Sequence, residues 1–347
     1  MLESDFSRLM SFSVQFIERG EFIPGGGDDR DRPSPSIERV FRSIGDELKR
    51  KGVEVGYFKL PNHDTAVGIA KNFLVTPPEA DILHICGQST YYGLRMSPKR
   101  TVATFHDLNI LRIRSGMRRK VIKELFFNLP VRHLKYLTAI SEATKRDLVA
   151  CTGCDPERIS VIGNPLTISS EPHTREFDVD RPRLLQIGAL PHKNIVRLAS
   201  ALAGLRVHVI VVGGVDVVSM DALIKNGIDV EFHPVLSDQE ILHQYRSADA
   251  VTFFSTIEGF GLPIIEAQAM GVPVLTSDVD PMRDVAGKGA LLADPFSVSS
   301  MRTLIERVIA DAEFRAAAVD AGRRNVQRFS PQAIAGKYLD FYEKMLQ

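Results

Sequence analysis

Short apolar runs alternate with amphipathic helical stretches along most of this chain, and this alternation constrains the fold more than any other feature. It is typical of parallel sheets whose strands are joined by crossover helices. A polar, proline-containing stretch over residues 164–181 interrupts the pattern, and a second alternation starts at Arg183. We therefore predict an α/β protein with two doubly wound, Rossmann-like domains and a ligand cleft between them.

The length of 347 residues also fits two domains of about 150 residues each. We expect an N-terminal domain over 1–168, a C-terminal domain over 169–330, and a last helix over 331–347 that packs back on the first domain. No run approaches the roughly 20 apolar residues of a membrane span. Three cysteines fit a reducing compartment, so we expect a cytoplasmic protein.

The pattern predicts individual elements. The expected strands are Phe12–Ile17, Val53–Phe58, Ile82–Ile85, Thr101–Phe105, Tyr136–Ile140, Arg183–Ile187, Arg206–Val212, Val230–Phe232, Ala250–Phe254 and Pro273–Thr276. The expected helices are Ile37–Lys51, a helix capped by Ser141 that runs to Ala150, Asn194–Ala203, Asp238–Ser247, Pro263–Met270, Val298–Asp311, Ala312–Arg328 and Pro331–Met345.

The most informative segment, 255–271, follows an apolar strand. Gly259 and Gly261 allow the backbone to approach a ligand closely, and Pro263 suits the first turn of a helix. The N–H groups at that helix start favour an anion such as a phosphate. Glu266 can accept two hydrogen bonds from a ribose diol, and Glu258 can meet another part of the same ligand. A stabilising carboxylate in an ordinary strand-to-helix loop is the alternative.

Glu258 and Glu266, with seven residues between them, resemble the E-x7-E motif of retaining glycosyltransferases of the GT-B fold, family four. The resemblance extends over 237–250 and 269–276, and covers roughly 183–345. It implies that Glu266 binds the nucleotide ribose and Glu258 the transferred sugar. It also implies that Gly259, Phe260, Gly261 and Leu262 lie beside the sugar and phosphates.

The departing nucleoside diphosphate needs positive charge. Lys193 matches the family lysine on the loop that begins at Gly188, whereas His192 stands where the family often has arginine. We expect all three residues to bind the donor. No Asp-x-Asp motif follows an apolar strand, and Asp29-Arg-Asp31 is typical of a solvated turn, so we expect no metal cofactor. Cys151 and Cys154 have metal-ligand spacing but no accompanying second pair.

The first half resembles the family less completely. His106, in a His-Asp-Leu sequence after a strand, is expected to bond the donor sugar or orient the acceptor, with a structural histidine as the alternative. Gly25 and Gly26 correspond to the family's glycine loop near the donor, or form a flexible turn.

Positive charge is concentrated in the first half: the formal net charge is +5 for residues 1–170 and −5 for residues 171–347. Residues 118–127 have the pattern of a basic amphipathic helix. This pattern predicts contact with an anionic membrane through residues 112–127, with Phe126 and Phe127 adding apolar contact. A core-packed helix with a solvated basic face is the alternative. We also expect peripheral association with the inner face of the plasma membrane.

The resemblance implies a retaining, metal-independent hexosyltransferase. Its donor would be a GDP- or UDP-hexose, with mannose favoured, and its acceptor a glycan or polyprenyl-linked glycan of a cell-surface polysaccharide such as lipopolysaccharide. A nucleotide-sugar epimerase or hydrolase of the same fold, or a non-catalytic nucleotide-sugar-binding subunit, remains open as an alternative. No nucleic-acid partner is expected.

Overall fold

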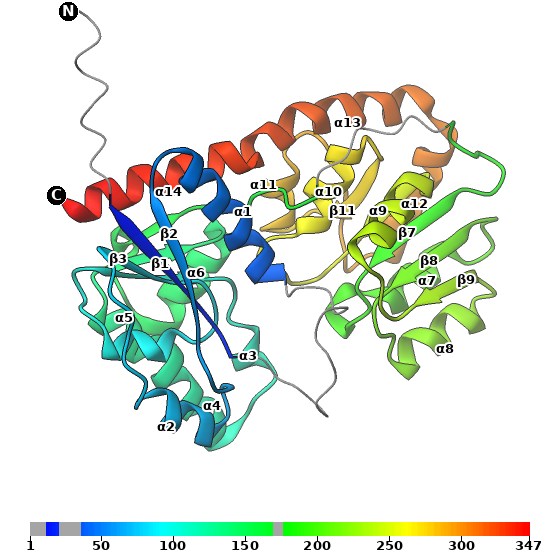
Figure 1. Cartoon of the computed structure of the whole chain (residues 1–347). Helices are drawn as coiled ribbons and strands as arrows, with labels where there is room; N and C mark the ends of the chain where they lie inside the picture. Colours follow the sequence, from blue (N-terminus) through cyan, green and yellow to red (C-terminus); the bar gives the residue numbers. More distant parts are fainter. Residues whose placement is uncertain (1–11, 21–35, 169–175) are drawn as a thin grey trace, which may run out of the picture. The chain divides into compact units, whose positions relative to one another are not determined.

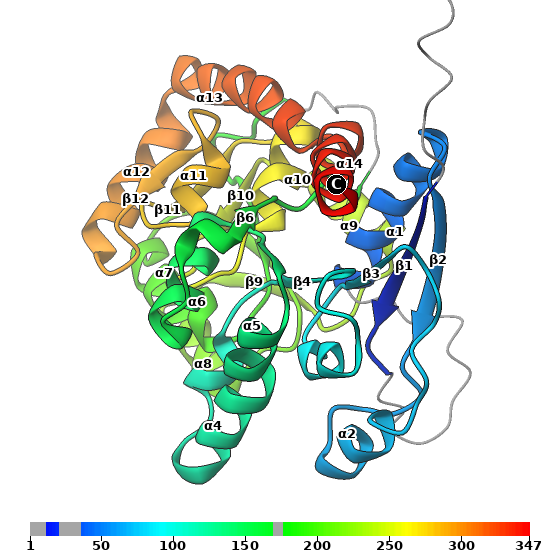
Figure 2. The same cartoon turned by 90° about the vertical axis from the view of Figure 1, so that its left-hand side faces the viewer.

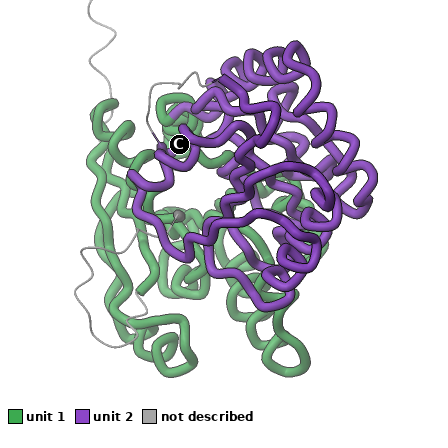
Figure 3. Tube along the Cα trace, turned by 90° about the vertical axis from the view of Figure 1, so that its right-hand side faces the viewer, with its two compact units in different colours: residues 1–165, 331–347 green, residues 166–330 purple. Residues whose placement is uncertain are grey.

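The computed structural model describes residues 12–20, 36–168 and 176–347. The chain divides into two compact units (Figure 3). The first unit contains residues 1–165 and 331–347, and the second contains residues 166–330. The division after Pro165 lies three residues before the predicted domain boundary, and the last helix belongs to the first unit.

The first unit is built on a parallel six-stranded sheet (Figure 1). Its strand order is β2-β1-β3-β4-β5-β6. The strands are β1 (Ser13–Glu18), β2 (Glu54–Lys59), β3 (Ile82–Ile85), β4 (Thr101–Phe105), β5 (Tyr136–Ala139) and β6 (Ile159–Val161). Because β1 and β2 progress in one direction and β3 to β6 in the other, the order of the sheet reverses between β1 and β3.

The helices of the first unit cover both faces of this sheet. They are α1 (Ser36–Arg50), α2 (Ala66–Asn72), α3 (Asn109–Arg112), α4 (Gly116–Lys123), α5 (Leu129–His133), α6 (Glu142–Thr152) and α14 (Pro331–Leu346). Helix α14 lies beside α1 on one face (Figure 2). Ser141 caps α6 by accepting a hydrogen bond from the N–H of Thr144, as predicted.

A buried polar network joins α14 to this sheet. The Nδ1 atom of His84 on β3 lies 2.5 Å from the hydroxyl of Tyr342, and its Nε2 atom lies 2.7 Å from Thr104 Oγ1. The ring of Tyr338 packs 5.4 Å from the His84 ring. Complete burial lowers the pKa of His84 to about 3, so the imidazole is neutral at pH 7. The C-terminal helix is therefore an integral part of the first unit.

The second unit contains another parallel six-stranded sheet, in the order β12-β11-β10-β7-β8-β9. Its strands are β7 (Arg183–Ile187), β8 (His208–Val212), β9 (Asp229–His233), β10 (Ala250–Phe253), β11 (Val274–Ser277) and β12 (Leu291–Ala293). The order of this sheet reverses between β7 and β10, which are hydrogen-bonded neighbours.

The helices of the second unit are α7 (Ile195–Leu202), α8 (Val217–Lys225), α9 (Asp238–Ser247), α10 (Leu262–Met270), α11 (Met282–Ala286), α12 (Val298–Ala310) and α13 (Ala312–Asn325). Helix α9 has the predicted bounds because its first turn contains a capping box. Ser237 accepts from the N–H of Glu240, and the Glu240 side chain accepts from the N–H of Ser237. The two sheets with their crossover helices confirm the predicted α/β fold class.

The prediction that Phe126 and Phe127 lie on an exposed face of the helix over 118–127 is wrong, and the core-packed alternative describes these two rings. Helix α4 ends at Lys123, and a π-helical turn, Glu124–Asn128, follows it. Phe126 and Phe127 are buried in the core of the first unit, at 6% and 5% exposure, because the turn directs both rings inward. Neither ring can contact a bilayer. None of the described helices is both long enough and apolar enough to span a membrane.

Candidate functional site

The reversal of strand order between β7 and β10 marks the place where a ligand site is expected in the second unit. In parallel α/β sheets, ligands bind outside the carboxyl ends of the strands, where neighbouring connections diverge. The loop after β7 contains Gly188, His192 and Lys193, and the loop after β10 contains Glu258 and the start of α10. Every predicted donor-binding residue of the second unit thus lies on one of these two loops or on α10.

An ion pair joins the two loops. The Nζ atom of Lys193 lies 2.6 Å from Glu258 Oε1, and each of these side chains is only 14% exposed. The same amine lies 4.6 Å from the centroid of the Phe253 ring. Gly188 has a φ of +82°, and a Cβ atom there would lie 2.7 Å from Lys193 Cε. Glycine is therefore required at 188 so that the lysine stem can cross this turn and reach the carboxylate.

His192 faces the same carboxylate from greater distance. Its Nε2 atom lies 3.9 Å from Glu258 Oε1. The backbone of His192 is held by Thr256, whose N–H donates to the His192 carbonyl at 2.8 Å and whose hydroxyl donates to it at 3.3 Å. Two side chains capable of positive charge therefore lie beside one carboxylate at the carboxyl edge of the sheet.

Helix α10 begins directly after Gly261, which has a φ of +105°. Pro263 occupies the first turn, and the N–H groups there give this end of the helix a partial positive charge. The ring of Phe260 is 5% exposed and packs at 5.5 Å against Phe329, so its side chain belongs to the core. Only the backbone at Phe260, together with Gly259, Gly261 and Leu262, remains as a donor contact in our prediction.

Glu266 lies in the second turn of α10 and is 8% exposed. Its Oε2 atom accepts a hydrogen bond of 2.7 Å from the hydroxyl of Tyr245 on α9. This hydrogen bond fixes the orientation of the carboxylate. Tyr245 did not emerge from the sequence, although it lies 21 residues before Glu266 on a helix whose resemblance to the family was evident.

A second residue missed by sequence reasoning is Gln186, which is completely buried on β7. Its Nε2 atom donates to the carbonyl of Gly188 at 3.1 Å, and its Oε1 atom accepts from Thr252 Oγ1 at 3.0 Å. The first bond holds the start of the loop after β7, and the second joins β7 to β10. An alternating strand pattern predicts an apolar residue at 186, so a buried glutamine at this position was the available signal.

His106 lies at the carboxyl end of β4 in the first unit and is 8% exposed. Its Nε2 atom lies 2.7 Å from the carbonyl oxygen of Cys86, to which it donates. Burial lowers the pKa of His106 to about 4, so the ring is neutral at pH 7 and its Nδ1 atom carries a lone pair. A neutral imidazole in this state can accept a hydrogen bond from a sugar hydroxyl.

The remaining predictions concern the glycine loop and a metal. Gly25, Gly26 and the Asp29-Arg-Asp31 sequence lie outside the described residues. Across 12–20, 36–168 and 176–347, no three His, Cys, Asp or Glu side chains lie close enough together to hold a metal ion.

Two parallel sheets, each with its own reversal point, define an α/β protein of the GT-B glycosyltransferase fold. Residues 57–169 match the family model described as glycosyltransferase family 4, and residues 169–325 match that of the glycosyl transferases group 1. The chain therefore belongs to the family-4-like glycosyltransferases, in agreement with the resemblance noted in its sequence.

Individual relatives agree with this assignment. The chain is 27% identical over 231 residues to the O-antigen chain mannosyltransferase RfbU of Salmonella typhimurium, a match that covers 63% of this chain and 64% of RfbU. Sucrose-phosphate synthase from Thermosynechococcus elongatus is similar in structure, with a TM-score of 0.75 and 16% identity over 96% of this chain and 98% of that one. HepE from Anabaena, solved with UDP and glucose, gives a TM-score of 0.71 and 18% identity, with 96% and 100% covered.

Proposed function

We propose that this protein is a retaining glycosyltransferase that transfers a hexose from a nucleoside-diphosphate sugar to a glycan or lipid-linked glycan. The observation that carries the proposal is the convergence of Lys193, Glu258 and the start of α10 at the reversal point of the second sheet. Lys193 and His192 provide fixed or titratable positive charge for a diphosphate, and the helix start adds backbone N–H groups. Glu266, oriented by Tyr245, binds the ribose diol.

The transfer follows from this arrangement. The acceptor hydroxyl oxygen bonds to the anomeric carbon on the face from which the diphosphate leaves, while the bond between that carbon and the phosphate oxygen breaks. The hydroxyl proton passes to the departing phosphate oxygen, so the products are the glycosylated acceptor and a nucleoside diphosphate. Lys193 stabilises the negative charge on the leaving group. Glu258, held by Lys193, is placed to accept hydrogen bonds from the transferred sugar.

The sugar is proposed from two considerations. His106 and the following Asp-Leu resemble the mannosyltransferase-like members, and RfbU is named as a mannosyltransferase of O-antigen. We therefore propose mannose as the transferred hexose and a cell-surface polysaccharide as the acceptor class. HepE was solved with UDP, which keeps UDP-hexoses beside GDP-hexoses as donors to be tested.

The test uses the full chain with GDP-mannose, UDP-glucose and a lipid-linked glycan acceptor. We expect acceptor-dependent transfer with retention, and loss of donor binding in Glu266→Ala. Glu306→Ala is the matched control, because Glu306 is exposed on α12 and pairs only with Arg302 in the contacts described. Full activity of Glu266→Ala would refute the site, and acceptor-independent release of the sugar would favour a hydrolase.

We propose further that α3 and α4 form the membrane-facing surface of the acceptor-binding unit. On α4, Met117 and Val121 are 72% and 54% exposed and lie four residues apart, and Ile113, just after α3, is 73% exposed. Arg118 and Lys120 are exposed beside them, and helix α4 has no buried residue. An exposed apolar stripe flanked by basic side chains favours an anionic bilayer. In this proposal the exposed apolar side chains of α4, and not Phe126 and Phe127, make the apolar contact with the membrane.

Vesicle binding tests the surface. Met117→Asp should reduce sedimentation with vesicles of phosphatidylglycerol, and Arg118→Ser combined with Lys120→Ser should weaken it about 30-fold, at about 1 kcal/mol for each basic residue. Val217→Asp is the control, because Val217 is 81% exposed on α8 of the second unit. Equal binding of Met117→Asp and Val217→Asp would exclude α4 as the contact.

A further inference from the structure

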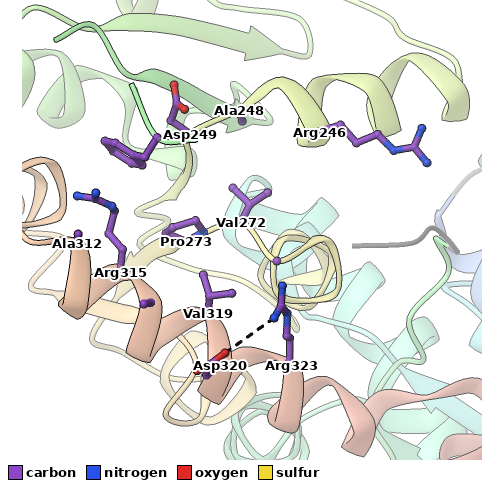
Figure 4. Close-up of a pocket in the computed structure, with 13 residues that line it drawn as sticks. Arg246, Ala248, Asp249, Val272, Pro273, Ala312, Arg315, Val319, Asp320 and Arg323 are labelled. Atoms are coloured by element: carbon purple, nitrogen blue, oxygen red, sulfur yellow. Dashed lines mark ion pairs between the residues drawn. The ribbon is translucent and has the colours of Figure 1, made fainter. Parts of the chain in front are cut away.

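The second unit has a pocket at the edge of its sheet opposite to the proposed donor site. It has a volume of about 330 Å³ and is formed by α13 together with two turns (Figure 4). One turn, at Ala248 and Asp249, immediately precedes β10, and the other, at 271–273, immediately precedes β11. The pocket is thus at the amino ends of these strands, whereas the loop containing Glu258 follows the carboxyl end of β10. The nine-residue helix α10, about 13 Å long, separates the two sites.

The wall contributed by α13 combines an apolar stripe with positive charge. Val319 lies between Arg315 and Arg323, at intervals of four residues, so these three side chains follow one side of the helix (Figure 4). The two arginines are about 12 Å apart along the axis. Val272 and Pro273 add apolar surface opposite this wall. A ligand in the pocket would therefore meet an apolar centre with a guanidinium group at each end.

The guanidinium groups of the two arginines differ in the contacts that they make with the rest of the protein. Arg315 donates to the carbonyls of Val308 and Ile309 at 2.6 and 2.9 Å and stacks 3.9 Å from the centroid of the Phe177 ring. Partial desolvation lowers the pKa of Arg315. Arg323 is exposed, and its ion pair with Asp320 is long, at 3.9 Å. A planar guanidinium with five donors can therefore bind an incoming anion at Arg323.

The two aspartates that line the pocket balance only part of the charge of its three arginines, Arg246, Arg315 and Arg323. Asp249 is 4% exposed, and its carboxylate accepts from the backbone N–H groups of Asp178 at 3.2 Å and Arg183 at 2.8 Å. The same carboxylate also interacts electrostatically with Arg315. Asp320 is exposed to solvent and lies beyond hydrogen-bond distance of Arg323.

We propose that this pocket binds a small molecule with an apolar body and one anionic group, with the anion on Arg323 and the body against Val319 and Pro273. The volume suits a ligand of this size. The proposal does not depend on the proposed glycosyltransferase function, because its residues are separate from the loops that carry Lys193 and Glu258.

Phenyl phosphate is a suitable probe, since it has one aromatic ring and one anionic group. Titration calorimetry with the full chain should detect its binding, and Arg323→Ala should weaken that binding at least about ten-fold. Arg324→Ala is the matched control, because Arg324 is also exposed in the last turn of α13 but does not line the pocket. Ala316→Phe, which fills the pocket from an exposed position, should abolish binding without disturbing the core.

Two further measurements separate this site from other sources of binding. Lys193→Ala should leave the affinity for phenyl phosphate unchanged, whereas loss of binding in that variant would assign the probe to the donor site and overturn the proposal. Phenol should bind at least ten-fold more weakly than phenyl phosphate. Equal affinity for the two compounds, or equal effects of Arg323→Ala and Arg324→Ala, would also overturn it.

Discussion

Replacing Gly188 by alanine should displace the amine of Lys193 and so weaken nucleotide binding, in addition to lowering the stability of the second unit. The new Cβ atom would lie 2.7 Å from Lys193 Cε and 3.3 Å from its Cδ, closer than such atoms approach in proteins. A lysine stem can move aside at little energetic cost, but its amine then leaves the 2.6 Å contact with Glu258. The substitution also places alanine at a φ of +82°, which costs about 1–2 kcal/mol.

Gly204 provides a control for the backbone cost alone. It has a φ of +77° in the same unit, and a Cβ atom there would meet nothing within 4 Å. Both alanine variants should therefore lose similar stability in thermal unfolding, about 2–4 °C for each kcal/mol. Calorimetry with GDP and UDP should separate them. Loss of a charge-assisted hydrogen bond predicts nucleotide binding at least about ten-fold weaker in Gly188→Ala, and unchanged binding in Gly204→Ala.

A double substitution completes the test. If Gly188→Ala acts only by displacing the lysine, adding it to Lys193→Ala should cause no further loss of nucleotide affinity. Additive losses would show that alanine at 188 disturbs the loop in some other way. Equal weakening of binding by Gly188→Ala and Gly204→Ala would refute the proposed steric mechanism.

Three further predictions follow from buried polar groups. Because the pKa of His106 falls to about 4 in the folded state, the unfolded chain binds more protons than the folded chain between pH 4 and 6.5. The contribution of His106 to the free energy of unfolding is therefore fully present above this range and falls on acidification by about 1.4 kcal/mol per pH unit. Denaturant titrations should show a shallower decline in His106→Gln. Tyr342→Phe should lower the free energy of unfolding by about 1–3 kcal/mol. Tyr136→Phe is the control and should cost less than about 0.5 kcal/mol, because the Tyr136 hydroxyl makes only a 3.5 Å bond to a backbone carbonyl. Equal losses in chemical denaturation would contradict the buried network. Tyr245→Phe should weaken nucleotide binding while leaving Glu266 in place, and unchanged calorimetric affinity would show that its hydrogen bond does not orient the carboxylate.

Long periodic elements were predictable because local signals and burial agree there. The capping box at Ser237 determines the start of α9, and Pro263 marks the start of α10. Several elements were missed. Strands β6 and β12 have three residues each and helix α11 has five, and the nine-residue helix α8 was not predicted either. A three-residue strand has too few side chains to show alternation, and neighbouring strands stabilise it through backbone bonds that leave no mark in the sequence.

The candidate site shows the same limit. The resemblance identified residues on the loops after β7 and β10, and the structure brings Lys193 and Glu258 into contact. Gln186 and Tyr245 were not predicted, because their roles depend on partners 66 and 21 residues distant. The misassigned rings of Phe126 and Phe127 have a related cause. A helical wheel assumes 3.6 residues per turn, and the π-helical turn changes which face each ring occupies.

The chain enters the second unit after Pro165 and returns to the first at Pro331, so the first unit is assembled from two separate parts of the sequence. A protein ended at residue 330 would retain the whole second unit but would lack Tyr338 and Tyr342. The side of His84 that α14 covers would then be open, and its Nδ1 atom would lose the hydroxyl of Tyr342, whereas its Nε2 atom would keep Thr104. During synthesis the first unit therefore cannot complete its core until the last helix has emerged, after the second unit has already been made.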